Sequence, residues 1–182
     1  MRRLQFPLLL LLAALAWAQP DDQAASRPSW QAVLAPPDEP GEPLRVSGTV
    51  FSEDGKTPVA GATVYVYHTD RHGNYSRDQR NSNQDPRLQG TMSTDSNGRY
   101  EYRTIKPGPY PGSRVPAHIH YVVTAPGHQR RVFEIVFAGD PFVTPNIEAQ
   151  ARRPGSIYSL QHLQKDAHNL WTCVQDVTLQ KE

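Results

Sequence analysis

The stretch LRVSGTVFSEDGKTPVAGATVYVYH, residues 44–68, contains two segments in which polar and apolar side chains alternate. In residues 44–50, apolar or small residues interleave with polar ones, as in a strand with one buried face. Asp54 and Gly55 then supply a turn, and residues 62–68 form a second run that is rich in β-branched and aromatic side chains. The stretch therefore predicts two strands joined by a turn.

Similar short segments, separated by Gly, Pro and Asn, continue along the chain. Four further strands are expected, around Tyr100 and Tyr102 and over residues 117–124, 131–137 and 171–179. Two short helices are expected over residues 145–151 and 159–165, and no long amphipathic helix separates the strands as it would in an α/β fold. The expected fold class is therefore all-β, an antiparallel β-sandwich with short helices or loops near the C-terminus.

The N-terminus has the features of an export signal. Two arginines precede an apolar run that is shorter than the roughly 18–20 residues of a transmembrane span, and a small-residue cleavage site ends at Ala18. We therefore expect residues 1–18 to be a signal peptide, and the mature protein to be secreted or periplasmic without a membrane segment. Residues 19–42, rich in Pro, Asp, Ala and Ser, are expected to be an extended leader outside the core of a single domain, residues 43–182.

The composition excludes several classes of function. Hydrophobic residues make up 37% of the chain, which is enough for one compact core. With 19 basic and 18 acidic residues the formal net charge is +1, so no summed field favours a nucleic acid or an anionic membrane as a partner. The single cysteine, Cys173, cannot form an intrachain disulfide or a multi-cysteine zinc site, which leaves packing, or a metal held by other ligands, to stabilise the fold.

The segment PAHIHY, residues 116–121, carries two histidines two positions apart. In a strand, His118 and His120 point to the same side, so that one strand offers two imidazoles to one metal ion. Such a pair alone is weak evidence, because surface and structural histidines are more common than metal ligands. Two tyrosines give it context: Tyr110 lies in the conformationally restricted segment KPGPYP, and Tyr75 lies in the loop after the second strand, although a single tyrosine usually serves core packing.

Three segments of the chain resemble the intradiol ring-cleavage dioxygenases, the family of catechol and protocatechuate dioxygenases. They comprise residues 46–75, 98–111 and 116–120. Lys-Pro-Gly-x-Tyr-Pro followed shortly by Pro-Ala-His-Ile-His is far more restrictive than either motif alone, and the similarity covers about residues 44–142. The resemblance implies a β-sandwich around a mononuclear non-haem ferric iron, Fe(III), with four protein ligands. These ligands would be Tyr75, Tyr110, His118 and His120.

The resemblance also implies the reaction. The partners would be a small aromatic diol and O2, and the ring would open between its two hydroxyl-bearing carbons, with Tyr110 leaving the metal and taking a substrate proton. A phenol, whose pKa is about 10, binds a trivalent cation in its deprotonated form, which accounts for tyrosine ligands. The other histidines, His68, His72 and His128, are expected to be structural or solvated, because four ligands are already assigned. A homo-oligomer is compatible with the sequence.

The chain departs from the family pattern at two positions. The family commonly has an arginine directly before the Pro-Ala-His segment, whereas that position here is Val115, and Arg114 lies one residue earlier. We expect Arg114 to take the catalytic role of stabilising negative charge that develops on the substrate. Glu134 lies near a position where family members often have glutamine, and its carboxylate is expected to be protonated or paired with Arg130 or Arg131.

Two other functions stay open on the sequence alone. One is a secreted, non-enzymatic binding module on the same sandwich, with the metal site retained or lost. The other is a hydrolase or a copper protein that uses His118 and His120. The second is the weaker, because the sequence has no Gly-x-Ser-x-Gly nucleophile elbow and no cysteine or methionine suitably placed near the histidine pair.

Overall fold

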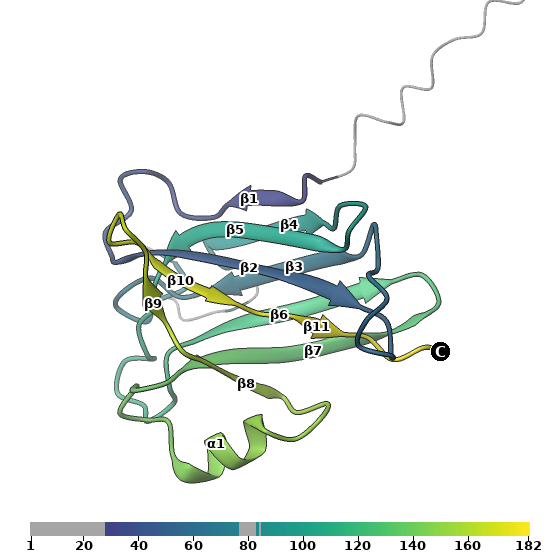
Figure 1. Ribbon diagram of the computed structural model, residues 1–182. Helices are drawn as coiled ribbons and strands as arrows, with labels where there is room; N and C mark the ends of the chain where they lie inside the picture. The colour runs from purple at the N-terminus through teal and green to yellow at the C-terminus, as the bar shows by residue number, and fades with distance from the viewer. Residues whose placement is uncertain (1–27, 77–82, 84) are drawn as a thin grey trace, which may run out of the picture.

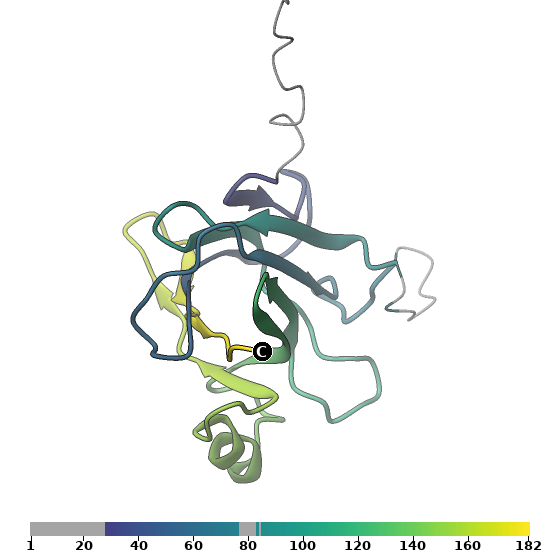
Figure 2. The same cartoon turned by 90° about the vertical axis from the view of Figure 1, so that its right-hand side faces the viewer.

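The computed structural model of the chain describes residues 28–76, 83 and 85–182. The expected signal peptide, residues 1–18, lies outside the described residues, as does the first part of the expected leader. In the described part of the chain, two β-sheets pack face to face and one short helix lies at their edge (Figures 1 and 2). The fold is mostly β and forms a sandwich, which confirms the expected class.

The first sheet has six strands. Its path in space runs through β1 (Gln31–Val33), β5 (Arg99–Ile105), β2 (Pro43–Phe51), β10 (Trp171–Val174) and β9 (Gln164–Lys165), and β11 (Val177–Thr178) also pairs with β2. β2 and β5 are antiparallel, whereas β1 pairs with β5, and β10 and β11 pair with β2, in parallel. The first sheet is therefore mixed.

The second sheet has five strands. They are arranged in the order β4 (Leu88–Ser93), β3 (Thr63–His68), β6 (His118–Ala125), β7 (His128–Phe137) and β8 (Tyr158–Gln161). The first three pairings are antiparallel, and β8 pairs with β7 in parallel, after a connection that contains α1 (Pro145–Ala151). A parallel neighbour requires such a crossover.

No helix among the described residues is long and apolar enough to cross a membrane.

Aromatic side chains fill much of the space between the sheets. Tyr100, Tyr102, Tyr121 and Phe133 are each at most 2% exposed, and the rings of Tyr121 and Phe133 stack with centroids 4.8 Å apart. The buried hydroxyls are satisfied: those of Tyr102 and Tyr121 lie 2.7 Å apart, and Tyr100 donates to the Gln175 carbonyl over 2.5 Å. Because side chains alternate along a strand, the two histidines of β6 point away from this core.

Most expected elements are confirmed, and the differences arise from strand pairing. The five strands expected before residue 138 are present, and residues 145–151 form α1. The helix expected over residues 159–165 is wrong, because this segment lies in β8 and β9, which pair with β7 and β10. Residues 171–179 form two short strands and not one. Both sheets of the sandwich are mixed, since four of the short strands pair in parallel with a neighbouring strand.

Part of the segment expected to be a leader belongs to the sandwich. β1 pairs with β5, and the next residue, Leu34, is 6% exposed within the main hydrophobic cluster. Glu39 forms a bidentate ion pair with Arg87, which precedes β4. The chain therefore joins the fold before residue 43, because an apolar side chain and a backbone pairing partner are both available there.

Candidate metal centre

Four side chains that the sequence suggests as ligands lie together on the outer face of the second sheet. His118 and His120 come from β6, where strand alternation places both on that face. Tyr75 lies in the loop after β3, and Tyr110 lies in the loop between β5 and β6. Residues from three separate segments therefore meet at one point.

Each donor atom of these four residues lies within hydrogen-bonding distance of at least two of the others. The hydroxyl oxygens of Tyr75 and Tyr110 are 2.5 Å apart. The Tyr75 oxygen lies 2.8 Å from His120 Nε2, and the Tyr110 oxygen lies 3.0 Å from His118 Nε2. The two Nε2 atoms are 3.1 Å apart. Two phenol oxygens and two imidazole nitrogens thus surround one small volume.

The other ring nitrogens hold the imidazoles in place. His118 Nδ1 donates to the Pro116 carbonyl over 2.7 Å, and His120 Nδ1 lies 3.2 Å from Glu134 Oε1. A carbonyl and an ionised carboxylate only accept hydrogen bonds, so each Nδ1 carries the proton and each Nε2 presents a lone pair to the cluster. Because two lone pairs cannot bond to each other, the facing Nε2 atoms suit a shared cation.

Burial decides the charge of the donors. Burial raises the pKa of the Tyr75 hydroxyl, and the neighbouring Tyr110 hydroxyl raises it further. Burial also raises the pKa of the Tyr110 hydroxyl. Burial lowers the pKa of His118, so its imidazole is neutral at neutral pH. For Glu134, burial opposes ionisation, but the hydrogen bond with His120 and the nearby histidines lower the pKa below its usual value. The two phenols and the His118 imidazole are therefore neutral at neutral pH, and the ionised carboxylate beside them favours a bound cation.

Glycines bring the two tyrosine-bearing loops into backbone contact. Gly73 has a φ of +83°, and a Cβ there would lie 1.9 Å from the Pro109 carbonyl oxygen. A Cβ at Gly108 would lie 2.4 Å from the Arg71 carbonyl oxygen. The Gly108 amide donates to the Asp70 carbonyl over 2.9 Å. The loops are therefore fixed against each other at distances that side chains would not allow.

Sequence reasoning missed Tyr67 and assigned Glu134 the wrong partner. Tyr67 lies opposite His120 in the β3–β6 register, and its ring stacks on the imidazole with centroids 4.4 Å apart. Glu134 lies opposite His120 on β7 and pairs with it, not with Arg130 or Arg131. The signal that could have found both is strand register, because directly paired residues share one face of a sheet.

The remaining residues of interest lie outside the cluster. Arg114 is exposed in the loop before β6 and forms no hydrogen bond or ion pair with another described residue, and Val115 is 40% exposed. His68 is buried and hydrogen-bonded through both ring nitrogens. His72 is exposed, and His128 contacts a serine hydroxyl. These three histidines have the environments expected of structural or solvated side chains.

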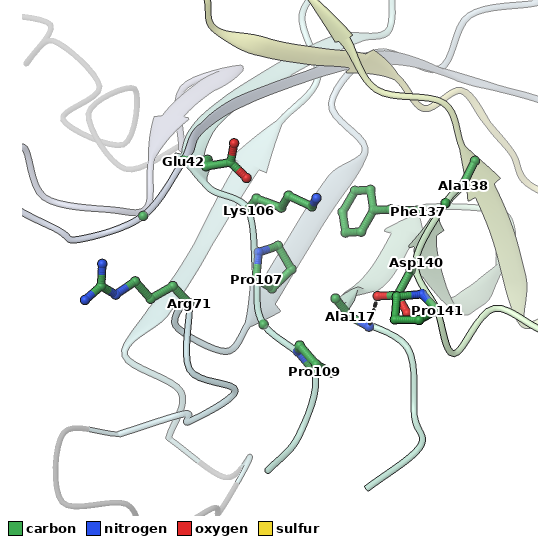
Figure 3. A pocket seen from close by; sticks show the side chains of 13 residues that line it. Glu42, Arg71, Lys106, Pro107, Pro109, Ala117, Phe137, Ala138, Asp140 and Pro141 are labelled. Atoms are coloured by element: carbon green, nitrogen blue, oxygen red, sulfur yellow. Dashed lines mark hydrogen bonds between the residues drawn. The ribbon is translucent and has the colours of Figure 1, made fainter. Parts of the chain in front are cut away.

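A surface cavity of about 630 Å³ is lined by residues of the loop before Tyr110 and of the segment after β7 (Figure 3). Its lining includes Pro109 and Ala117, which adjoin two of the four candidate ligands in the chain, but none of the four. Lys106 extends toward Phe137, whereas Arg71 extends away from both (Figure 3). The two cationic side chains do not converge, so the cavity lacks a focused anion site and the donor cluster is the stronger candidate for chemistry.

The fold and the cluster together define a class of protein, a β-sandwich with two phenol and two imidazole donors at one point. Residues 22–181 match the family model described as "Dioxygenase". The chain is 33% identical over 153 residues to catechol 1,2-dioxygenase 2 of Acinetobacter lwoffii, and 36% identical over 113 residues to the protocatechuate 3,4-dioxygenase beta chain of Burkholderia cepacia. These matches cover 74% and 57% of this chain. The chain belongs to the intradiol ring-cleavage dioxygenase family.

Solved structures agree with this assignment. Catechol 1,2-dioxygenase from Acinetobacter sp. ADP1, inhibited by bound mercury, is 30% identical with a TM-score of 0.66, over 86% of this chain and 59% of that one. The dioxygenase domain of a dioxygenase carbohydrate-binding protein fusion from Streptomyces sp. SirexAA-E is 26% identical with a TM-score of 0.64, over 92% of this chain and 94% of that one. The chain spans about half the length of the two curated relatives, 54% and 48%.

Proposed function

We propose that this protein is a dioxygenase that uses a mononuclear non-haem ferric iron to open a catechol-type ring between its two hydroxylated carbons. The observation that carries the proposal is the convergence of two phenol oxygens and two imidazole Nε2 atoms, each of which lies 2.5–3.4 Å from at least two of the others. Membership of the dioxygenase family supports it.

The donor set fits ferric iron. Tyr75, Tyr110, His118 and His120 would be its ligands. Two tyrosines that lose their protons on binding supply two negative charges, which suit a trivalent cation better than a divalent one. Hard oxygen donors favour the ferric state, whereas sites of two histidines and one carboxylate hold ferrous iron. The chemistry that ferric iron supplies when bound is activation of a chelated aromatic diolate for reaction with O2.

The protein would hold three donors firmly and release one. His118 and His120 are fixed by the hydrogen bonds of their Nδ1 atoms, and Tyr75 is 3% exposed. Tyr110 is less buried and lies in the loop before β6. Its phenol oxygen would take one proton from a substrate hydroxyl as the diol binds. Both oxygen atoms of O2 then enter the product, a dicarboxylic acid, and no external reductant is consumed.

Metal analysis, a visible spectrum and an oxygen-uptake screen over substituted catechols test the proposal. We expect about one iron per chain, a visible tyrosinate-to-ferric absorption band, and oxygen consumption with at least one catechol. A colourless protein without iron would contradict the metal assignment. A coloured protein that consumes no oxygen with any diol would favour the binding module over the enzyme.

Arg114 is the cation that we propose to act on the substrate. It lies in the exposed loop between two of the proposed ligands, and its guanidinium has no other partner among the described residues. Loss of one such donor typically lowers turnover by about 10²–10³-fold. Arg114→Ala should therefore lower turnover while iron content and melting temperature stay unchanged. Unchanged turnover would contradict this role.

We further propose that the protein is exported and processed after Ala18. The support is the sequence itself, in which two arginines, an apolar run and a small-residue site follow one another. N-terminal sequencing of protein from the native host should begin at Gln19. An intact Met1 in a cytosolic fraction would contradict export.

A further inference from the structure

His120 is held from both neighbouring strands. On one side, Tyr67 of β3 lies opposite it, and the two rings are nearly parallel, with an interplanar angle of 15°. On the other side, Glu134 of β7 lies opposite it and places Oε1 3.2 Å from Nδ1. The stacked ring limits tilting of the imidazole, and the carboxylate limits its rotation. Nε2 is thereby directed at the two tyrosine hydroxyls.

The two histidines of the cluster differ in the charge of their partners. His118 Nδ1 donates to a neutral main-chain carbonyl, whereas His120 Nδ1 faces a carboxylate. The side chains of His120 and Glu134 are 14% and 30% exposed, so water screens their interaction only in part. A hydrogen bond to an anion is stronger than one to a neutral acceptor, and it makes the imidazole more basic.

We propose that Glu134 is a positioning residue that fixes the Nδ1–H form of His120 and makes His120 the stronger electron donor of the two imidazoles. This inference rests on the proposed ferric site. A stronger donor stabilises the higher oxidation state of a bound metal, so Glu134 biases the centre toward ferric iron. His118, whose partner belongs to the main chain, has no comparable charge.

Direct ligation by Glu134 is the competing arrangement. Its carboxylate, His118 and His120 each offer a ligand atom within 4.8 Å of the others. However, Glu134 meets His120 at Nδ1, while the hydroxyls of Tyr75 and Tyr110 meet it at Nε2, at 2.8 and 3.4 Å. The carboxylate and the tyrosines therefore approach different nitrogens of one ring, which favours support over ligation.

Two substitutions separate charge from hydrogen bonding. Glu134→Gln retains an oxygen that accepts from Nδ1–H but removes the charge, and Glu134→Ala removes both. Glu101→Gln is the matched control, because Glu101 is a partly buried strand residue of the other sheet. The full-length variants, loaded with Fe(III), are compared in iron retention against a chelator, in the position of the visible charge-transfer band and in melting temperature.

We expect Glu134→Ala to lower iron affinity by about 10–100-fold. Glu134→Gln should lower it less, because the hydrogen bond is retained. In both variants the tyrosinate-to-ferric band should move to longer wavelength, because His120 donates less charge and the iron becomes a better electron acceptor. The control should match the parent. A purely structural role would change the melting temperature without moving the band.

Each contrary result has a distinct meaning. A parent protein without a ferric band contradicts the proposed function itself. A parent with the band, and Glu134 variants with unchanged affinity and band position, would overturn the role of Glu134 alone. Iron loss in Glu134→Gln as complete as in His120→Ala would make the carboxylate a ligand and would overturn the positioning role.

Discussion

At the scale of single residues, the four side chains of the donor cluster differ in how firmly the protein holds them. Each imidazole is fixed at its Nδ1 atom, and Tyr75 is buried and hydrogen-bonded to both Tyr110 and His120. Tyr110 is more exposed. The tyrosine that the proposed reaction must move is thus the less buried of the two.

This difference predicts opposite effects for two substitutions. Tyr110→Phe leaves three donors, so the protein should retain much of its iron while turnover falls to near background, because the phenol oxygen that takes the substrate proton is gone. His118→Ala removes a rigid strand ligand and should lose most of the iron. The iron-to-protein ratio after dialysis and the rate of oxygen uptake are the measurements.

Tyr65→Phe is the control for removal of a phenol hydroxyl. Tyr65 lies on the same strand as Tyr67 and hydrogen-bonds to Gln89 and not to the cluster. Its substitution should leave iron content and turnover close to those of the parent. Full activity in Tyr110→Phe would contradict the proposed proton transfer, whatever the iron content.

At the scale of elements, the site depends on close backbone contact between the loop after β3 and the loop before β6. Glycine makes this contact possible. Gly73 combines a positive φ with a Cβ position occupied by the Pro109 carbonyl. Gly73→Ala should therefore push the loops apart and separate the two tyrosines, and we expect at least a 10-fold loss of iron affinity together with a lower melting temperature. Chelator competition and thermal unfolding measure the two effects.

Gly61→Ala separates backbone strain from the clash. Gly61 has a φ of +70° and no atom within 4 Å of the added Cβ, so its substitution imposes strain of about 1 kcal/mol without displacing a neighbour. Iron affinity should stay at the parent value in this variant. If both glycine variants lost iron equally, contact between the loops would not be what positions the tyrosines.

Local patterns predict long strands better than short ones. β2, β3 and β6 each present an alternating buried face, and this alternation is visible in the sequence. β9 and β11 have two residues each, and their pairing partners decide their conformation. The wrong helix over residues 159–165 has the same origin, because pairing with distant strands overrides a weak local preference.

The candidate site was predictable as a set of residues but not as a geometry. The spacing of His118 and His120 on a strand already implies a shared face. Their meeting with Tyr75 and Tyr110 was expected from resemblance and not from spacing, since the tyrosines come from separate loops. The position of Glu134 beside His120 follows from the register of β6 with β7, and a single sequence does not specify that register.

At the scale of the whole molecule, the segment before β2 contributes to stability. Leu34 is 6% exposed in the main core, whereas Val33, its neighbour, is 70% exposed. Leu34→Ala should lower the free energy of unfolding by about 2–5 kcal/mol, as for other buried leucines. Val33→Ala should change it by no more than about 0.5 kcal/mol. Urea denaturation measures both, and equal effects would contradict a core role for this segment.

Stability of the whole fold should also depend on pH through His68. Burial lowers the pKa of His68 to about 4, and its ring nitrogens are engaged by the Thr69 carbonyl and the Thr104 hydroxyl. In the unfolded chain the pKa is 6.5, so between these two values the unfolded state binds more protons than the folded state. The contribution of His68 is therefore fully present above about pH 6.5 and is lost as pH falls to about 4, with a total of about 3 kcal/mol.

Denaturation of the parent and of His68→Gln at several pH values isolates this effect. Other groups titrate in both proteins, including His118, whose pKa burial also lowers, so the quantity to compare is the difference between the two curves. The variant should be less stable at pH 7.5 because a packed side chain has changed, and it should lose less stability on acidification. The two curves should approach each other toward pH 4, with iron content matched in both samples. Parallel curves over this range would mean that His68 has the same pKa in the folded and unfolded chains. That result would contradict the predicted effect of burial on His68.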